Sequence, residues 1–269
     1  MSKKQRLDLL LVERNLCESR QWAQRLIRAG DVKVNQQRVD KPGTEVAIDA
    51  EIEVKAKPPY VSRGGEKLAK ALAVFGVEVR DRICLDGGIS TGGFTDCLLQ
   101  QGARQVYGVD VGYGQVAWPL RQDSRVILRE RTNLRHLTPA DLYGEAELAD
   151  LGVADLSFIS LTKVLPAFWP LLRAPRELIV LVKPQFEVGK ARVGKKGVVR
   201  DPRDHADAIW GVITAAQGLG WQYRGLTWSP ITGPAGNVEY LLWLREGKGE
   251  GIDLSTVREL TAGAIAALR

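Results

Sequence analysis

The stretch that decides the fold runs from Asp86 to Asp96 and reads Asp-Gly-Gly-Ile-Ser-Thr-Gly-Gly-Phe-Thr-Asp. An apolar run at residues 83–85 precedes it, and a segment with helical apolar spacing, Phe94 to Leu99, follows it. A strand, a glycine-rich turn and a helix in this order form the nucleotide pocket of a doubly wound α/β domain. A plain tight turn would need the same glycines, so the rest of the chain must distinguish the two interpretations.

The composition of the 269 residues is that of a globular protein, with 45% hydrophobic and 26% charged residues. The length suits one large domain, or a standard domain with a small companion. Three cysteines, none in a Cys-x-x-Cys pair, argue against a disulfide scaffold or a zinc site and fit a reducing cytoplasm. The N-terminus has no signal-peptide core and no apolar run could span a bilayer, so we expect a cytoplasmic protein that binds neither metal nor membrane.

The net charge of the chain is +6. A positive balance of this kind favours a polyanionic partner, most simply a nucleic acid. Ordinary solubility charge, spread over the surface without a partner, is the alternative.

The N-terminal part of the chain predicts a small module of its own. Leu7, Leu10 and Leu11 recur at helical spacing, and a second helix is bounded by Ser19 as its N-cap and Gly30 as its C-cap. Short alternating segments between residues 32 and 54 predict a small sheet. Two helices and a small sheet are too little for an enzyme, but they suit a recognition module.

Several motifs of this module are those of a known RNA-binding domain. They are Arg6-Leu7-Asp8, Ser19-Arg20, the run from Ile27 to Asn35, and Lys41-Pro42-Gly43. On these motifs residues 5–55 resemble the domain typified by ribosomal protein S4, except that Gln36 stands where that family usually has glycine. The resemblance implies that basic residues meet the phosphate backbone, namely Arg6, Arg20, Arg25, Arg28 and Lys33. A solvated basic helix face is the alternative.

A proline pair in Lys57-Pro58-Pro59-Tyr60 interrupts regular structure and stiffens a short linker. We therefore expect four consecutive regions: an S4-like RNA-binding domain over residues 1–58, a linker over 59–62, a second domain over 63–246 and a C-terminal tail or helix over 247–269.

Strand and helix patterns alternate along the second domain. Strands are predicted at residues 83–86, 105–110, 125–129, 153–156, 178–183, 223–228 and 238–244, and helices at 66–75, 91–101, 162–172 and 205–219. This alternation predicts an α/β fold with a doubly wound, mostly parallel, Rossmann-like sheet. The last two strands have no helix between them, so we expect an antiparallel hairpin that closes the sheet.

Acidic residues at two strand ends indicate the kind of ligand. Asp110 follows the apolar run 106–109, a position where an acidic residue accepts hydrogen bonds from ribose hydroxyls. The glycine turn begins with an acid, Asp86, unlike the Gly-x-Gly-x-x-Gly of dinucleotide enzymes. An acid there can meet the amino group of S-adenosylmethionine, which we expect as the cofactor in preference to NAD; a turn-capping role of Asp86 is the alternative. The expected cofactor-binding residues are Asp86, Gly87, Gly88, Ser90, Gly92, Gly93, Phe94, Asp110, Asn133 and Asp155.

Four charged residues stand at element ends or inside apolar strands. Lys67 opens a helix, Asp155 and Lys183 end apolar strands, and Glu239 interrupts another apolar strand. Charges at such positions are costly unless they are paired, and the carboxyl ends of parallel strands meet at one crevice. We therefore expect the four to lie together, with unrelated ion pairs as the alternative.

The motifs around these residues are specific. They are Ser62–Leu68, Ser90–Asp96, Asp155–Ser160, Lys183–Glu187 and Gly236–Glu239. They resemble the FtsJ-like RNA ribose 2′-O-methyltransferases and, joined to the S4-like domain, the TlyA family of ribosomal RNA methyltransferases, some of which are called haemolysins. Gly87 and Ile89 depart from the family's first motif, in which an apolar residue and an alanine stand at these two places.

The resemblance implies a Lys-Asp-Lys-Glu tetrad formed by Lys67, Asp155, Lys183 and Glu239. It implies 2′-O-methylation of 16S or 23S ribosomal RNA, or of both, at a cytidine, with S-adenosylmethionine as methyl donor and ribosomal RNA or ribosomal subunits as partners. Lys183 is expected to take the proton of the ribose hydroxyl in its neutral form, which desolvation and a neighbouring cation, Lys67, favour. Asp155 and Glu239 would hold the two lysines in place.

Residues 187–204 carry glycines and several basic residues directly after Lys183, which predicts a mobile basic loop that closes over RNA. A surface loop without a role is the alternative. The loop residues Lys190, Lys195 and Lys196, together with Arg63, complete the expected RNA-binding set. Residues 131–135 follow the third strand and are placed to line the adenine side of the cofactor pocket.

Two rival functions belong to other classes. A membrane-lytic protein would need a spanning segment or a strongly amphipathic cationic helix, and the sequence shows neither. A non-catalytic RNA-binding protein would have no need for all four tetrad positions to be filled.

Overall fold

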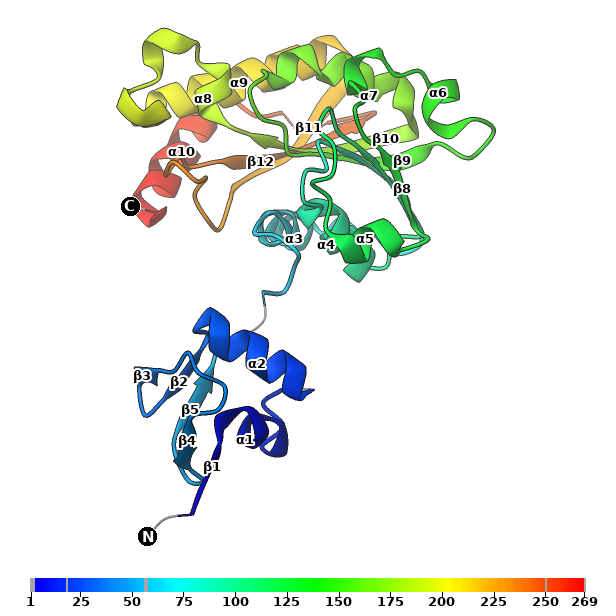
Figure 1. Ribbon diagram of the computed structural model, residues 1–269. Coiled ribbons are helices and arrows are strands. Elements are labelled where there is room, and N and C mark those ends of the chain that lie inside the picture. Colours follow the sequence, from blue (N-terminus) through cyan, green and yellow to red (C-terminus); the bar gives the residue numbers. More distant parts are fainter. Residues whose placement is uncertain (1–2, 18, 56–57, 250, 269) are drawn as a thin grey trace. The chain divides into compact units, whose positions relative to one another are not determined.

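The computed structural model describes residues 3–17, 19–55, 58–249 and 251–268 (Figure 1). The chain divides into two compact units, Met1–Pro58 and Pro59–Arg269. Each unit has a hydrophobic core of its own, as expected for separate domains in one chain.

The described part of the N-terminal unit contains two helices and five short strands. They are β1 (Lys4–Arg6), α1 (Leu7–Glu13), α2 (Arg20–Ala29), β2 (Val32–Val34), β3 (Gln37–Arg38), β4 (Glu45–Ala47) and β5 (Ile52–Val54). The predicted caps of α2 are confirmed, because Oγ of Ser19 accepts a hydrogen bond from the backbone N–H of Trp22 and Gly30 closes the helix with a left-handed φ of 72°. Leu7, Leu11 and Ile27 are fully buried between the two helices and the strands.

The turn between β2 and β3 shows how this chain replaces the glycine that its sequence lacks. Asn35 and Gln36 have φ values of 49° and 66°, in the left-handed region that glycine usually occupies. The side chain of Gln36 donates to Glu53 at 2.7 Å, and Oδ1 of Asn35 accepts from the backbone N–H of Glu51 at 3.0 Å. These bonds to the neighbouring strand hold the turn in place.

The described residues of the second unit form a seven-stranded sheet with helices on both faces (Figure 1). The strands are β6 (Ile83–Gly87), β7 (Gln105–Val109), β8 (Val126–Arg129), β9 (Ala149–Ala154), β10 (Leu172–Val182), β11 (Trp221–Trp228) and β12 (Tyr240–Glu246). Their order is β11-β12-β10-β9-β6-β7-β8, in which β12 is antiparallel to both neighbours and all other pairs are parallel. The predicted doubly wound sheet with a closing antiparallel hairpin is confirmed.

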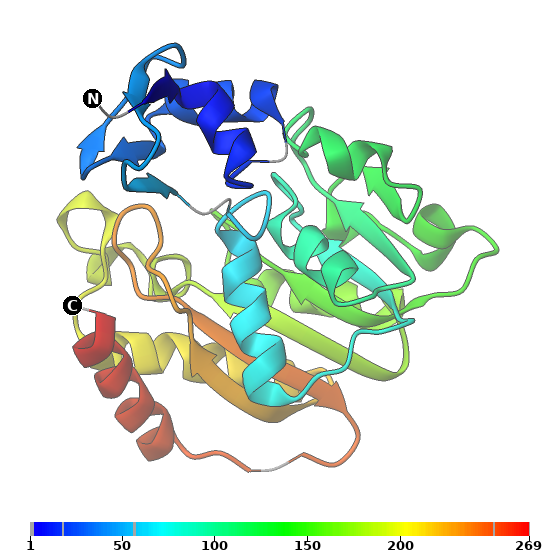
Figure 2. The same ribbon diagram turned by 90° about the horizontal axis from the view of Figure 1, so that it is seen from below.

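The helices form a layer on each face of the sheet. They are α3 (Gly64–Phe75), α4 (Gly93–Gln100), α5 (Trp118–Gln122), α6 (Pro139–Tyr143), α7 (Leu165–Leu171), α8 (Pro184–Glu187), α9 (Pro202–Gly218) and α10 (Leu254–Leu268). Helices α7 and α9 pack on one face, and α3 and α4 pack on the other, where Figure 2 shows α3 in cyan lying across the strands. The carboxyl ends of the parallel strands stay uncovered by either layer, and the site lies there.

Short elements and strand ends differ from the predictions. β1, α5, α6 and α8 are not predicted, because none exceeds 5 residues and such segments show too little periodicity. The predicted strand at 153–156 ends at Ala154, so Asp155 lies just beyond it. The strand predicted at 238–244 begins at Tyr240, because the backbone N–H of Gly233 bonds the carbonyl of Asn237 at 2.8 Å and keeps the preceding residues in a turn. Glu239 therefore precedes the strand instead of interrupting it.

Candidate active site

The glycine-rich turn after β6 folds against the ends of the two neighbouring strands. The backbone N–H groups of Gly88 and Ile89 donate to the carbonyl of Val109, at 2.8 and 3.2 Å. Gly88 has a φ of 87°, and a Cβ atom there would lie 3.0 Å from the carbonyl oxygen of Asp155. A side chain at this position would push the two segments apart, so the glycine is what allows the turn to lie beside Asp155.

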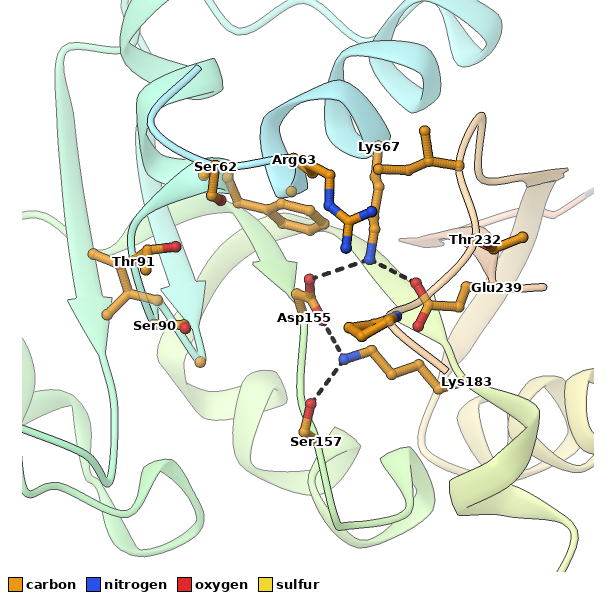
Figure 3. Close-up of a pocket in the computed structure, with 17 residues that line it drawn as sticks. Ser62, Arg63, Lys67, Ser90, Thr91, Asp155, Ser157, Lys183, Thr232 and Glu239 are labelled. Carbon is orange, nitrogen blue, oxygen red and sulfur yellow. Dashed lines mark hydrogen bonds and ion pairs between the residues drawn. The ribbon is translucent and has the colours of Figure 1, made fainter. Parts of the chain in front are cut away.

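The four charged residues from separate elements form one continuous chain of ion pairs (Figure 3). Nζ of Lys67, in α3, lies 2.6 Å from Oε2 of Glu239 and 3.9 Å from Oδ2 of Asp155. The other oxygen of Asp155, Oδ1, lies 2.6 Å from Nζ of Lys183. The structure thus brings all four predicted residues together, and the sign of the charge alternates along the order Glu239, Lys67, Asp155 and Lys183.

This chain of charges is largely withdrawn from water. The side chains of Lys67 and Glu239 are only 9% and 2% exposed. Lys183 is nearly as deeply buried, whereas Asp155 is partly exposed. A single charge at this depth would be costly, but neighbours of alternating sign compensate one another. An amine held in this way beside a cavity is a group that can take a proton from a bound hydroxyl.

The tetrad lines a cavity of about 290 Å³. The glycine turn, the N-terminal end of α3 and the loop before β12 form its other walls (Figure 3). Hydroxyl-bearing side chains are frequent in the lining, namely Ser62, Ser90, Thr91, Ser157 and Thr232. Arg63, expected to contact RNA, lines the same cavity and is exposed.

A second cavity, of about 520 Å³, adjoins the first. Its lining combines the polar residues Asp110 and Asn133 with apolar side chains, among them Leu134, Leu156 and Ile159. The two cavities share Gly88, Ser90, Asp155 and Ser157. A hollow of this size with an apolar wall and few polar groups suits a ligand of nucleoside size.

The carboxylate of Asp110 fixes the loops that surround the second cavity. Its Oδ2 accepts a hydrogen bond from the backbone N–H of Ser90 at 2.8 Å, and its Oδ1 accepts one from the backbone N–H of Gly112 at 2.7 Å. A carboxylate oxygen has a second lone pair, so each oxygen can still accept from a ribose hydroxyl. Asp110 therefore lies where the sequence places it, and its geometry fits the expected ligand.

Three expected cofactor residues lie behind the cavity walls. Asp86 is fully buried; its Oδ2 accepts from Oγ1 of Thr95 at 2.7 Å, and its Oδ1 has no hydrogen-bond partner among the described residues. Burial raises the pKa of Asp86 to about 7. A Cβ atom at Gly87 would lie 2.7 Å from Phe168, and one at Gly92 would lie 2.3 Å from Leu120. These residues shape the turn from the core side, so the expected direct contact between Asp86 and the ligand is not what the geometry supports.

The remaining expected cofactor residues line one cavity or both. Gly93 and Phe94 line the first, Asp110 and Asn133 line the second, and Gly88, Ser90 and Asp155 line both. Two further residues that line the first cavity were not expected from the sequence: Ser157, whose Oγ accepts a hydrogen bond from Nζ of Lys183, and Thr232, in the irregular segment before β12. The one feature of the sequence that pointed to Ser157 was its position two residues after Asp155, a residue of the expected tetrad.

Two of the expected RNA-binding arginines of the N-terminal unit are held by a buried carboxylate. Arg6 binds Asp8 with two N–H groups, each at 3.0 Å, and Nε of Arg20 lies 2.9 Å from the same side chain. The hydrogen bonds from Arg6 hold the pKa of Asp8 below its usual range. Arg25 and Arg28 are exposed on α2, and Lys33 lies 3.7 Å from Glu53.

The basic segment after α8 contains two short 3₁₀ turns, Lys190–Arg192 and Lys195–Gly197. Lys190, Lys195 and Lys196 are exposed. The far end of the segment is tied down, because Asn237 accepts from the N–H of Val199 at 3.0 Å and donates to the carbonyl of Gly197 at 2.8 Å. The expected mobility of this loop stays a prediction.

Within the described ranges, no helix combines the length and the apolar character that crossing a membrane requires. No cluster of three or more His, Cys, Asp or Glu side chains that could hold a metal ion occurs among the described residues.

Comparison with known proteins gives one consistent result. The FtsJ-like methyltransferase family matches residues 60–246, and the S4 domain matches residues 5–52. The chain is 54% identical over 258 residues to "Putative rRNA methyltransferase YqxC" of Bacillus subtilis, covering 94% of this chain and 90% of the relative. It is 49% identical over 247 residues to "16S/23S rRNA (cytidine-2'-O)-methyltransferase TlyA" of Mycobacterium tuberculosis, covering 91% of each chain. A solved structure, "Putative hemolysin from Streptococcus thermophilus", is similar with a TM-score of 0.74 and 42% identity, over 98% of this chain and 96% of that one.

Proposed function

This chain belongs to the FtsJ-like methyltransferase family and carries an S4 domain before its methyltransferase domain, and we propose that it methylates a ribose 2′-hydroxyl of ribosomal RNA. The observation that carries the proposal is the ion-pair chain from Glu239 to Lys183 at the junction of two cavities. One cavity has the size for a nucleoside, and the other presents an amine to whatever enters it.

The second cavity supports S-adenosylmethionine as the methyl donor. Asp110 is placed for the ribose hydroxyls, and the apolar side chains of Leu134 and Ile159 provide a surface for the adenine ring. When bound, this cofactor supplies an electrophilic methyl group. Asp155, shared by both cavities, is the carboxylate next to which a positively charged methyl donor is favoured.

In the first cavity the acceptor hydroxyl needs a base, because a ribose 2′-hydroxyl is a poor nucleophile until it loses its proton. Lys183 in its neutral form takes that proton at Nζ. The oxygen would then be able to accept the methyl group that the cofactor, held by Asp110 and the apolar wall of the second cavity, would supply. Lys67 and Glu239 hold Asp155, and through it Lys183, in the geometry that this transfer needs.

The basic residues support RNA as the substrate. Arg25 and Arg28 are exposed on one helix of the S4 domain, and Arg6 and Arg20 are oriented by Asp8. Arginine forks of this kind bind phosphate oxygens without reading the base sequence. The catalytic unit has exposed basic residues of its own, namely Arg63 at the first cavity and Lys190, Lys195 and Lys196. The curated relative from M. tuberculosis acts on cytidine in 16S and 23S rRNA, so we take both as candidate targets.

The proposal includes a division of labour along the chain. Residues 1–58 serve as the RNA-binding domain, 59–62 as the linker, 63–246 as the methyltransferase domain, and 247–269 as a C-terminal segment that contains α10. The place of action is the cytoplasm, where ribosomal RNA is found.

The decisive experiment incubates the purified protein with methyl-labelled S-adenosylmethionine and with small ribosomal subunits, large ribosomal subunits and naked ribosomal RNA. We expect label in at least one RNA, and mapping of 2′-O-methyl groups should place it on a ribose. Absence of label from every substrate, or label on a base, would overturn the proposal. The Lys183→Ala protein provides the background measurement.

A further inference from the structure

We propose that Ser157 is a positioning residue that orients the amine of Lys183 toward the acceptor hydroxyl. The inference rests on the proposed function, because it concerns the base of that reaction. Ser157 lies within the Asp155–Ser160 motif but is assigned no role from the sequence, and it lines both cavities.

The contacts of Nζ of Lys183 carry the argument (Figure 3). Nζ lies 2.6 Å from Oδ1 of Asp155, but this ion pair does not have the angles of a hydrogen bond. Nζ does donate a hydrogen bond to Oγ of Ser157, at 2.9 Å. Within the described residues the bond to Ser157 is thus the directional contact of this amine, whereas the attraction to Asp155 has little preference for orientation.

Direction matters because a primary amine rotates about its Cε–Nζ bond. A neutral lysine has two N–H groups and one lone pair, and only the lone pair can take a proton. When one N–H points at Ser157 and the carboxylate of Asp155 attracts the other, the lone pair must occupy the third position. Lys183 lines the first cavity, so that position is available to a hydroxyl bound there.

The loop that carries Ser157 is fixed to the segment that follows Lys183. The carboxylate of Glu187, in α8, accepts from Oγ of Ser160 at 2.6 Å and from the backbone N–H of Leu161 at 2.8 Å. The rings of Phe158 and Phe186 also lie against each other, with centroids 5.4 Å apart. Both ends of the hydrogen bond from Lys183 to Ser157 are therefore held by the same two segments, which is what a positioning contact requires.

The charged groups that face Lys183 do not replace this contact. Asp155 follows β9, and Lys67 and Glu239 reach Lys183 only through Asp155. From α8 the ring of Phe186 lies 6.0 Å from Nζ, and a ring face has no acceptor atom that fixes one N–H. Loss of the Ser157 hydroxyl should therefore leave Lys183 paired with Asp155 but free to rotate about its Cε–Nζ bond.

The first test compares Ser157→Ala with the wild type in single-turnover methyl transfer over a range of pH. We expect the plateau rate to fall roughly 10- to 100-fold, the loss typical of a misaligned reacting group, with the affinities for S-adenosylmethionine and RNA unchanged. Ser157→Thr, which restores the hydroxyl, should recover most of the rate.

A matched control and a second readout keep the result specific. Ser124→Ala removes an exposed hydroxyl that lines neither cavity, so its rate of methyl transfer should equal that of the wild type. The second readout is the rate of Lys183 acetylation by acetic anhydride at one pH, followed by mass spectrometry, which needs no turnover. This rate should fall in Ser157→Ala, because the lone pair of the amine then points into the cavity for less of the time, and it should stay at the wild-type value in Ser124→Ala.

The outcomes separate this inference from the proposed function. If Ser157→Ala keeps the wild-type rates of methyl transfer and of Lys183 acetylation, or if its loss lies only in substrate affinity, the positioning role is overturned. If the wild type transfers no methyl group while Ser157→Ala still slows the acetylation of Lys183, the proposed reaction is wrong and the contact between Ser157 and Lys183 stands.

Discussion

Nζ of Lys67 lies 2.6 Å from Oε2 of Glu239, although 172 positions separate the two residues in the chain. Helix α3 brings the lysine from one side and the segment before β12 brings the glutamate from the other. Both side chains are buried, so each ion is compensated mainly by its partner. The pair therefore links the stability of the domain to the geometry of its site.

Removal of one member of this pair should destabilise the protein more than removal of both. Glu239→Leu leaves Lys67 buried beside fewer compensating charges, and we expect the free energy of unfolding to fall by about 3–5 kcal/mol. The double variant Lys67→Met/Glu239→Leu should recover most of that loss and remain inactive. Urea denaturation monitored by tryptophan fluorescence measures the free energy of unfolding of the single and the double variant.

The exposed pair of Arg104 and Glu147 provides the control, since its side chains are 55% and 60% exposed. Glu147→Ala should cost less than about 1 kcal/mol. A loss for Glu239→Leu that is equally small would show that the buried pair contributes little to stability.

Substitution of the proposed base should separate chemistry from binding. Lys183→Ala removes the amine that takes the proton, so we expect no detectable methyl transfer while titration calorimetry shows S-adenosylmethionine binding within a few-fold of the wild type. Lys248→Ala, at an exposed position after β12, should be as active as the wild type. Retained turnover in Lys183→Ala would rule out its role as the base.

Asp86 should make the protein less stable as the pH rises toward neutrality. Its pKa is raised from 3.8 to about 7 by burial, so the folded state binds more protons than the unfolded state between these values. By linkage, stability falls as the pH rises from about 4 to about 7 and then stays level, by a total on the order of a few kcal/mol. Asp86→Asn, which keeps an acceptor for Thr95, should flatten this dependence.

Thermal unfolding at a series of pH values between 4 and 8 measures the effect of Asp86, with Asp81→Asn, at an exposed turn residue, as the matched control. We expect the melting temperature of Asp86→Asn to change less over this range than that of the wild type or of Asp81→Asn. If the melting temperature of Asp86→Asn depends on pH as steeply as that of the wild type, a group other than Asp86 causes the pH dependence.

The exposed arginines of α2 should contribute to RNA affinity mainly through phosphate contacts. Arg25→Ala and Arg28→Ala should each weaken binding about equally for RNAs of different sequence, and each should reduce the slope of log Kd against log salt concentration by about one. Arg258→Ala, on the exposed side of α10, is the control. Filter binding over a salt series checks this, and unchanged slopes for both α2 variants would contradict an S4-type contact.

Much of the fold could be predicted because its signals are local. The caps of α2, Ser19 and Gly30, and the alternation of apolar strands with amphipathic helices depend on residues a few positions apart. The same reasoning fails for α5 and α8, which are too short to show a period. It also misplaces the start of β12, because a turn that ends at Asn237 competes with strand pairing there.

The four charged residues could be singled out in the sequence, because charges at element ends and in apolar runs are costly unless paired, and the family resemblance implied that they form a tetrad. The sequence does not show which of these residues pair with one another. Which lysine meets which carboxylate depends on the approach of α3 to β9, β10 and β12, and these elements are far apart in the chain.

By itself the sequence determined the two modules, the order of strands and helices and the composition of the site, because periodicity, capping and motif spacing are properties of short segments. Only the tertiary structure decided that Asp86 is buried behind the cavity wall and that the amine of Lys183 donates a hydrogen bond to Ser157 besides pairing with Asp155. Both outcomes depend on how loops pack at the carboxyl ends of the strands. Contacts of about 3 Å there join segments that are far apart in the sequence, so no local sequence pattern predicts them.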